Sequence, residues 1–512
     1  MEQQAKAASA GVIVGLMLSL FIAALDATVV STAMPKIAAA LSGFDRYTWP
    51  FTSYLLTCTI ATLLCGGIAA RVGHKKMFML GILVFAGASL GCALSSSIEA
   101  LTAMRAVQGV GGGFVESGVF ITVAELFEPR ERGKYMGAIS SMYGLASVAG
   151  PLVGGLIADT VGWHWIFLVN LPISIVALVL VTKFLPGKSA HSESRLDLRG
   201  AVLASATVVP LILAFSLTGD LFAWWSAPFF GLLIAAALFG ALLVAAEKGR
   251  ERPIVPVQLF ARKQVSAAFV LSFGAQFLLL AGIMFIPRFA QEALGLSSTE
   301  SAYATIPMTL ALIIGSNASG RLFGKTGRMR MLARIAFIVM GAGSLALGII
   351  GAETNLAQIA VSSAVLGFGI GMSMPLGNIA AQTGAEPHNI GKATSMALFF
   401  RGLGGTIGTA ACGAAVGASS VGAAPAVFGI CIALAATCLV TMVWLPKMIE
   451  GRRGARGRAH AAGGANGARG ANGDASVRIT DISCERPAAQ GAEGEIASGN
   501  PRPKPASPNV VP

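Results

Sequence analysis

Long apolar segments dominate this sequence and decide what it can fold into. Fourteen of them follow one another between residues 11 and 446. A helix needs about 20 apolar residues to cross a bilayer core, whereas the strands of a membrane barrel alternate over about 10 residues. We therefore predict an all-α membrane protein with 14 transmembrane helices, at residues 11–34, 49–70, 77–95, 101–126, 135–158, 163–184, 199–218, 224–246, 265–286, 299–319, 331–351, 357–383, 391–418 and 424–446.

The charged residues indicate how these helices are oriented. Only 12% of residues are charged and the net charge is +13, but no nucleic-acid-binding module accompanies the positive charge. Lysine and arginine are concentrated in the loops after even-numbered segments, which places those loops in the cytoplasm. We expect a multi-pass protein of the cell (cytoplasmic) membrane with both termini cytoplasmic and no nucleic-acid partner.

An internal repeat indicates the domain organisation. The stretch Gly66-x3-Ala70-Arg71-x-Gly73-His74-x-Lys76 recurs 254 residues later as Gly320-x3-Gly324-Lys325-x-Gly327-Arg328-x-Arg330. The two stretches lie eight segments apart, which fits two six-helix halves with two inserted helices. Duplicated halves are a transporter design, with the substrate site between them. The predicted domains are an N-terminal six-helix bundle (1–184), a linker region with helices 7 and 8 (185–264), a C-terminal six-helix bundle (265–446) and a disordered cytoplasmic tail (447–512).

Four ionisable residues lie inside the apolar segments: Asp26, Arg105, Glu116 and Arg401. A charge at the bilayer centre costs about 2.5–3.5 kcal/mol on insertion scales, so such residues are candidates for function. Asp26 and Arg105 lie at comparable depths, and we expect that they can pair. Arg105 and Glu116 share one helical face with Gly109 and Gly112, and that face is expected to line a cavity.

Each of these residues also has a purely structural interpretation. Asp26 could serve only as a partner of Arg105, Glu116 as a hydrogen-bonded core residue, and Arg401 as a helix-packing residue. An adjacent cation favours an ionised carboxylate, whereas apolar surroundings favour a neutral one. We therefore expect Glu116 to carry a proton and Asp26 to act as a charge switch or cation contact.

Enzymatic chemistry finds no support in the sequence. Gly324-Lys325-Thr326 resembles the end of a phosphate-binding loop, but Ser319 stands where that loop needs glycine. The seven cysteines show no metal-ligand spacing. We predict no catalytic residue, no cofactor and no metal.

Several motifs resemble one known family. They are Leu25–Pro35, Gly66–Lys76, Arg105–Gly109, Gly144–Gly155, Trp163–Phe167 and Arg401–Gly405. Their order and spacing resemble the major facilitator superfamily, and within it the fourteen-helix drug:proton antiporters of the EmrB/QacA type. The resemblance implies a gating loop with Gly66, Arg71, Gly73, His74 and Lys75, and an antiporter motif with Gly150, Pro151, Gly154 and Gly155. Two positions depart from the family, since Ala70 replaces an acidic residue and His74 replaces arginine or lysine.

The implied function is proton-coupled efflux of amphipathic small molecules by alternating access, as in multidrug efflux and antibiotic resistance. The alternative is a dedicated exporter of one metabolite, antibiotic or lipid. A membrane receptor would need a sensory domain and a channel would need a continuous pore, and duplicated halves favour neither. We expect a monomer whose partners are its substrate, protons and the lipid bilayer.

Overall fold

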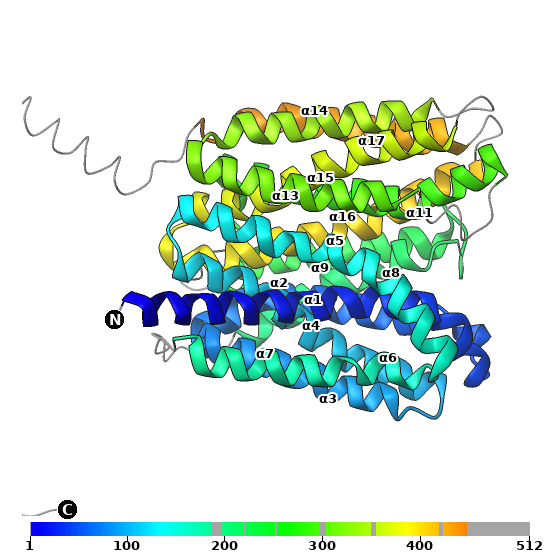
Figure 1. The fold of residues 1–512 in the computed structure, drawn as a ribbon, viewed down its shortest axis with the longest axis horizontal. Coiled ribbons are helices and arrows are strands. Elements are labelled where there is room, and N and C mark those ends of the chain that lie inside the picture. The colour runs from blue at the N-terminus through cyan, green and yellow to red at the C-terminus, as the bar shows by residue number, and fades with distance from the viewer. Residues whose placement is uncertain are drawn as a thin grey trace, which may run out of the picture. The chain divides into compact units, whose positions relative to one another are not determined.

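The computed structural model describes residues 2–186, 197–219, 221–248, 250, 253–295, 304–349, 355–418 and 423–447. Within these ranges the chain is predominantly helical (Figure 1). The predicted disordered tail lies outside the described residues except for Lys447.

The first seven helices form what we call the N-terminal group. Within it, α4 packs against α2 and α3, and α1 packs against α5 and α7. Ser97 caps α4 by accepting a hydrogen bond from the backbone N–H of Ala100. The bounds are α1 (Glu2–Ala40), α2 (Trp49–Val72), α3 (His74–Ala93), α4 (Ile98–Leu126), α5 (Pro129–Thr160), α6 (His164–Leu168) and α7 (Asn170–Phe184), with a short η1 (Phe44–Arg46) between α1 and α2.

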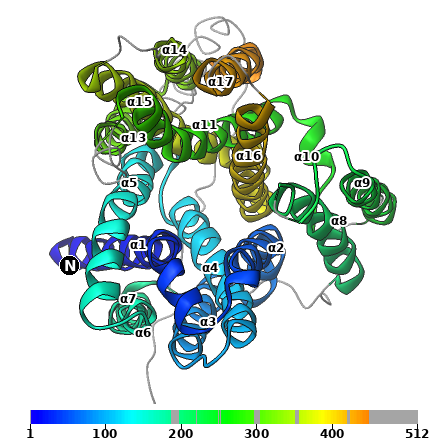
Figure 2. The same ribbon diagram turned by 90° about the vertical axis from the view of Figure 1, so that its right-hand side faces the viewer.

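Two further long helices follow, α8 (Leu198–Ser216) and α9 (Ala227–Glu247). They pack against each other, and α8 also contacts α2 and α16. Figure 2 shows them at the flank of the bundle, with α8 beside α2 and α16 and with α9 on the outer side of α8. The short α10 (Gln258–Ala261) connects them to the rest of the chain.

The remaining helices form the C-terminal group. In it α13 and α14 pack on α15, α11 packs on α16, and α17 packs on α14. The capping box of Asn355 and Gln358 starts α15. The bounds are α11 (Lys263–Leu294), α13 (Ile306–Thr326), α14 (Met329–Gly348), α15 (Leu356–Gly384), α16 (Ile390–Ala418) and α17 (Ala423–Thr441), with η2 (Pro387–Asn389) and η3 (Met442–Trp444).

Twelve spans in the described part of the chain are long and apolar enough to cross a membrane, and α6 and α7 together form one of them. The chain is thus a multi-pass membrane protein, but this number falls short of the fourteen expected. The helices α13 and α16, which are 21 and 29 residues long, are not among these twelve spans. Their glycines and polar residues, among them Asn317, Arg321 and Arg401, lower their hydropathy.

The sequence repeat has a structural counterpart. Gly73, which follows α2, has a φ of +88°, and Gly327, which follows α13, has a φ of +65°. Both donate a backbone hydrogen bond to the residue four positions earlier, Ala69 and Phe323 respectively. Glycine adopts such φ values without strain, so both copies of the repeat end a helix at a glycine with positive φ, although ψ differs (140° at Gly73 and 6° at Gly327).

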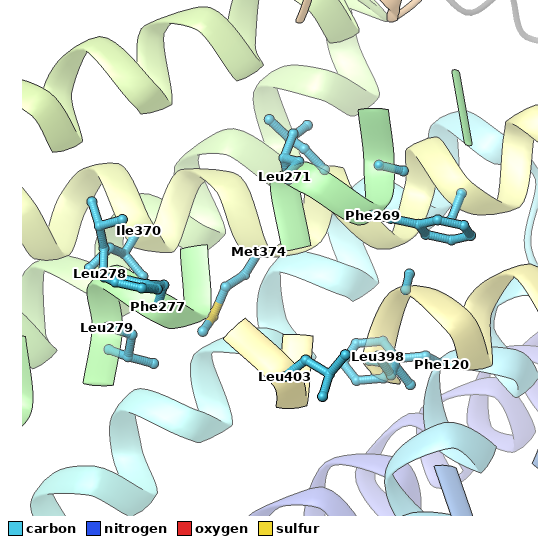
Figure 3. Packing of buried hydrophobic residues seen from close by; sticks show 14 of the residues in the cluster. Phe120, Phe269, Leu271, Phe277, Leu278, Leu279, Ile370, Met374, Leu398 and Leu403 are labelled. Atoms are coloured by element: carbon cyan, nitrogen blue, oxygen red, sulfur yellow. The ribbon is translucent and has the colours of Figure 1, made fainter. Parts of the chain in front are cut away.

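The two groups meet mainly along two helix pairs, α2 with α16 and α5 with α13, and α5 also contacts α15 and α4 contacts α16. Repeat-related glycines lie at both of the main contacts. A Cβ atom on Gly66 would lie 2.6 Å from the carbonyl oxygen of Gly391, and one on Gly320 would lie 2.2 Å from that of Gly133. Only glycine permits these backbone approaches. One apolar cluster also includes side chains from both groups, among them Phe120 of α4 and Leu398 of α16 (Figure 3).

Candidate functional site

The first candidate site is an ion pair inside the N-terminal group. Asp26 of α1 and Arg105 of α4 form it, as their expected depths allowed, and both side chains are 0% exposed. Arg105 also lies over the ring of Tyr54, with its guanidinium carbon 4.1 Å from the ring centroid. The cost of burying such a pair is offset in part by hydrogen bonds to its remaining polar atoms.

Neighbouring amides donate to the carboxylate, whereas Nη2 of Arg105 has no hydrogen-bond partner among the described residues. The side-chain nitrogens of Gln108 and Asn170 each donate to the Oδ1 atom of Asp26 over 2.9 Å. Arg105 donates to the amide oxygen of Gln108 over 2.7 Å. Three helices, α1, α4 and α7, are therefore joined by one polar network within the N-terminal group.

The second candidate site joins the two groups. Glu116 of α4 forms an ion pair with Arg401 of α16. The Arg401 side chain is 8% exposed and that of Glu116 is 21% exposed, so the pair is less enclosed than the first. The expectation that Glu116 has only glycines and apolar residues around it is wrong, because a cation lies directly beside its carboxylate.

Tyr143 of α5 completes this second site. Its hydroxyl donates to Oε1 of Glu116 and accepts from Arg401, and both distances are 2.5 Å. The guanidinium carbon of Arg401 lies 4.7 Å from the ring centroid of Tyr143 and 5.6 Å from that of Phe120. We call Glu116, Phe120, Tyr143 and Arg401 the inter-group cluster.

Glu116 and Arg401 lie at similar distances from the ends of their helices. Glu116 lies ten residues before the end of α4, and Arg401 lies eleven residues after the start of α16. At 1.5 Å per residue, both lie about 15 Å from the helix ends nearest to the Gly66 and Gly320 contacts. The cluster therefore lies well inside the bundle.

The helix face between Arg105 and Glu116 differs from expectation. Gly109 and Gly112 do not line a cavity. Added Cβ atoms would meet the side chain of Thr57 at 2.2 Å and that of Tyr54 at 2.7 Å. These glycines instead allow α4 to pack closely on α2, so the two charged residues at the ends of this face belong to separate sites.

The predicted gating loop lies between α2 and α3. His74 is buried at the start of α3, and its Nδ1 atom lies 2.6 Å from Oε2 of Glu125 in α4. Lys75 donates to the carbonyl oxygens of Thr182 and Leu185 at the end of α7. Gly66 contacts α16 and Gly73 forms the turn, while Arg71 lies partly exposed in the last turn of α2.

The predicted antiporter motif lies in α5 against α1. Added Cβ atoms would lie 2.0 Å from Oγ1 of Thr28 at Gly150 and 2.9 Å from the carbonyl oxygen of Val29 at Gly154. Gly155 has open space around it, and Pro151 lies in the same helix. Nearer its N-terminal end α5 carries Gly133 and Gly137 against α13, so α5 packs closely on both groups.

A third charged cluster joins the two inserted helices. Asp197 caps α8 by accepting from the backbone N–H of Gly200 and forms an ion pair with Arg250. Burial opposes its ionisation, but these two hydrogen bonds hold the pKa of Asp197 below its ordinary value. Glu247 is 1% exposed beside Gly200, and neither carboxylate oxygen has a hydrogen-bond partner among the described residues.

Sequence reasoning missed several of these contacts. Tyr143 precedes the antiporter motif by one residue, and Glu125 has no motif signal at all. Gln108 lies inside the quoted Arg105–Gly109 motif and Asn170 follows the Trp163–Phe167 motif by three residues, but nothing in their spacing indicated that both would donate to Asp26. Among the described residues no group of three or more acidic, histidine or cysteine side chains could hold a metal ion.

Comparison with known proteins agrees with this architecture. Residues 16–409 match the Major Facilitator Superfamily. The multidrug transporter protein MdtP of Bacillus subtilis is 33% identical over 408 residues, covering 80% of this chain and 75% of its own length. Multidrug resistance protein 3 of the same organism is 32% identical over 399 residues, covering 78% of this chain and 77% of its own.

Two solved structures share the fold at low identity. The human organic anion transporter MFSD10 aligns with a TM-score of 0.64 at 16% identity, covering 84% of this chain and 99% of its own. The proton:xylose symporter XylE aligns with a TM-score of 0.61 at 17% identity, covering 85% and 96% respectively. With a family match over residues 16–409 and the same helical fold, this chain belongs to the major facilitator superfamily.

Proposed function

We propose that the protein is a proton-coupled efflux transporter of amphipathic small molecules that works by alternating access. The relatives named as multidrug transporters support export as the direction and a broad substrate range. The moving halves in this proposal are residues 1–184 and 265–446, with residues 185–264 as a linker. We further propose that α13 and α16 also cross the membrane, which gives fourteen spans and the EmrB/QacA type, and that the transporter acts as a monomer in the cell membrane.

The inter-group cluster carries this proposal. Alternating access requires the two halves to separate, and the Glu116–Arg401 pair joins them inside the bundle. A proton on Glu116 would cancel its charge and remove its attraction for Arg401, so proton binding would favour separation. The Asp26–Arg105 pair lies within one half and need not open. We assign proton coupling to Glu116 and Arg401, and a charge-positioning role to Asp26 and Arg105.

The described conformation fits one step of such a cycle. The glycine contacts of Gly66 and Gly320 lie at the helix ends that carry the basic loops, and these loops face the cytoplasm by the positive-inside rule. Since the two groups touch at these helix ends, the described conformation is closed on the side that we assign to the cytoplasm. The same assignment puts both termini in the cytoplasm. Return to the cytoplasm-open state then requires that the Gly66 and Gly320 contacts separate.

The available energy suffices for export without ATP. A driving force of about 150 mV supplies on the order of 3.5 kcal/mol per proton. That free energy corresponds to a substrate gradient of a few hundred-fold. One proton per cycle is therefore enough for useful efflux.

A proteoliposome assay tests the proposal. Addition of a transported compound should drive proton movement in the opposite direction with the wild-type protein. Glu116→Gln should abolish uphill accumulation but retain downhill exchange, because it removes the proton site and keeps the side-chain volume. Glu386→Gln, which removes an exposed carboxylate, is the control and should transport normally.

The same assay separates the alternatives. Response to a single compound in a broad panel would identify a dedicated exporter. Uphill accumulation by Glu116→Gln at wild-type levels would contradict the role of Glu116 and transfer proton coupling to Asp26. Wild-type flux without exchange kinetics would indicate a channel.

A further inference from the structure

The surroundings of Arg401 have the chemistry of a cation-binding site. A carboxylate lies on one side of its guanidinium group, and the rings of Tyr143 and Phe120 lie 4.7 and 5.6 Å away. Aromatic faces within about 6 Å of a cation, together with an anion, are how proteins bind organic cations. Here the cation is a side chain of the protein itself.

The parts of this site are divided unequally between the two groups. Glu116 and Phe120 lie one helical turn apart on α4, and Tyr143 lies on α5. Only Arg401 comes from the C-terminal group. When the groups separate, the N-terminal group therefore keeps a complete anionic and aromatic site, and Arg401 leaves it.

An empty site of this kind is unstable at that depth. An uncompensated carboxylate inside a membrane protein is costly, so a proton or another cation must replace Arg401. We infer that Glu116, Tyr143 and Phe120 form a binding site for the charged group of an organic cation, and that Arg401 occupies it as a tethered competitor in the described state. This inference rests on the proposed export function and adds the charge class of its substrate.

A comparison with Arg105 shows why a ligand could replace Arg401 but not Arg105. Arg105 also has a carboxylate and an aromatic ring around it, namely Asp26 and Tyr54. However, its side chain is 0% exposed, and Gln108 and Asn170 complete the hydrogen bonds of Asp26. That site lies within one group, so separation of the groups would not remove its arginine.

Equilibrium binding tests the inference without any proton gradient. The probe is radiolabelled tetraphenylphosphonium, with the full-length protein in nanodiscs at constant pH. Arg401→Met should bind the probe at least about tenfold more tightly than the wild type, because the competing cation is gone. That factor corresponds to about 1.4 kcal/mol of relieved competition. Arg262→Met removes an exposed cation and should leave binding unchanged.

Further variants separate competition from a simple enlargement of the cavity. The double variant Arg401→Met with Glu116→Gln should lose the gain, and so should Arg401→Met with Tyr143→Leu. Triphenylphosphine oxide, a neutral compound of similar shape, should bind equally to wild type and Arg401→Met. If Arg401→Met does not yield a monodisperse protein, Arg401→Gln takes its place with the same expectations.

The outcomes are distinct from those of the transport assay. Equal or weaker probe binding by Arg401→Met, or an equal gain for the neutral compound, would overturn the inference even if proton-coupled export is observed. The predicted binding pattern without proton flux would support the site and contradict the proposed coupling.

Discussion

The two ion pairs inside the bundle both join an arginine to a carboxylate, but their surroundings differ. Asp26 and Arg105 are fully enclosed within the N-terminal group, and two amides donate to the carboxylate. Glu116 and Arg401 lie between the groups and share one tyrosine hydroxyl, and the Glu116 side chain is 21% exposed. The first arrangement is suited to permanence and the second to separation. The amide hydrogen bonds to the carboxylate and the helices that carry each pair, rather than the charges, make this distinction.

The largest expected effect comes from removing one arginine at a time. Arg105→Met leaves Asp26 as a buried carboxylate without its cation, and breaking a buried pair in this way costs about 3–5 kcal/mol. Arg401→Met leaves Glu116 partly exposed, where water or a proton can compensate. We expect a much lower thermal unfolding temperature for Arg105→Met than for Arg401→Met in the same detergent. Equal losses would mean that both pairs are structural.

The second prediction concerns a substitution that opens the contact between the groups and leaves the Asp26–Arg105 pair intact. Gly320→Val places a side chain against the backbone of Gly133, where a Cβ would lie 2.2 Å from an oxygen, so α13 and α5 must move apart. Ser316 of α13 is 0% exposed and donates to the carbonyl oxygen of Gly137.

A cysteine at position 316, in a background without other cysteines, should react with thiol reagents several-fold faster once Gly320→Val is present. Gly67→Ala is the control for α2, since its Cβ would make only ordinary contact with Ile254, 3.6 Å away. A cysteine at position 89, next to the Asp26 network, should stay protected in both variants. Reactivity at both positions would indicate general unfolding instead of separation.

The third prediction extends the comparison to the Asp197–Arg250 ion pair, which lies outside the spans. Asp197 has a lowered pKa, so its stabilising effect is present at neutral pH and is lost as pH falls through that lowered pKa. Asp197→Ala should cost about 1 kcal/mol at pH 7, the typical value for a lost helix cap. The difference in melting temperature from wild type should shrink at acidic pH. A constant difference would mean that packing, not charge, is responsible.

The smallest effect is expected at Glu247. Its carboxylate is buried beside that of Asp197 without a hydrogen-bond partner among the described residues. Glu247→Gln removes the like charge and supplies N–H donors, so the free energy of unfolding should rise by less than about 1 kcal/mol. Differential scanning fluorimetry at pH 8 would measure it. A lower melting temperature would show that Glu247 has a donor from elsewhere in the chain.

Much of this fold was predictable because hydrophobic periodicity and loop charge are local signals. The sequence repeat has a structural counterpart, since Gly73 and Gly327 share a positive φ and a backbone hydrogen bond to the residue four positions earlier. The depth of a residue along its helix was also predictable, and it indicated that Asp26 and Arg105 lie at comparable depths and can pair. The number of apolar spans was harder to predict, since α13 and α16 carry polar residues that a hydropathy criterion penalises.

The inter-group cluster was not predictable, for a geometric reason. Spacing gives the face of a helix on which Glu116 lies but not which helix of the other group approaches that face. Glu116 and Arg401 are 285 residues apart, and no local pattern connects them. The same limit explains Gly109 and Gly112, which were expected to line a cavity and instead pack against α2.

The glycine contacts between the groups also bear on how fast the protein can work. At Gly66 and Gly320 the partner atoms are backbone, so no rotamers need to change when the contact opens. Rigid displacements of helices occur in microseconds to milliseconds. These backbone contacts add little resistance to such a displacement, whereas the apolar side chains that the two groups share, among them Phe120 and Leu398, must separate with it. The pace of a cycle would then depend on these side chains and on ion exchange at Glu116.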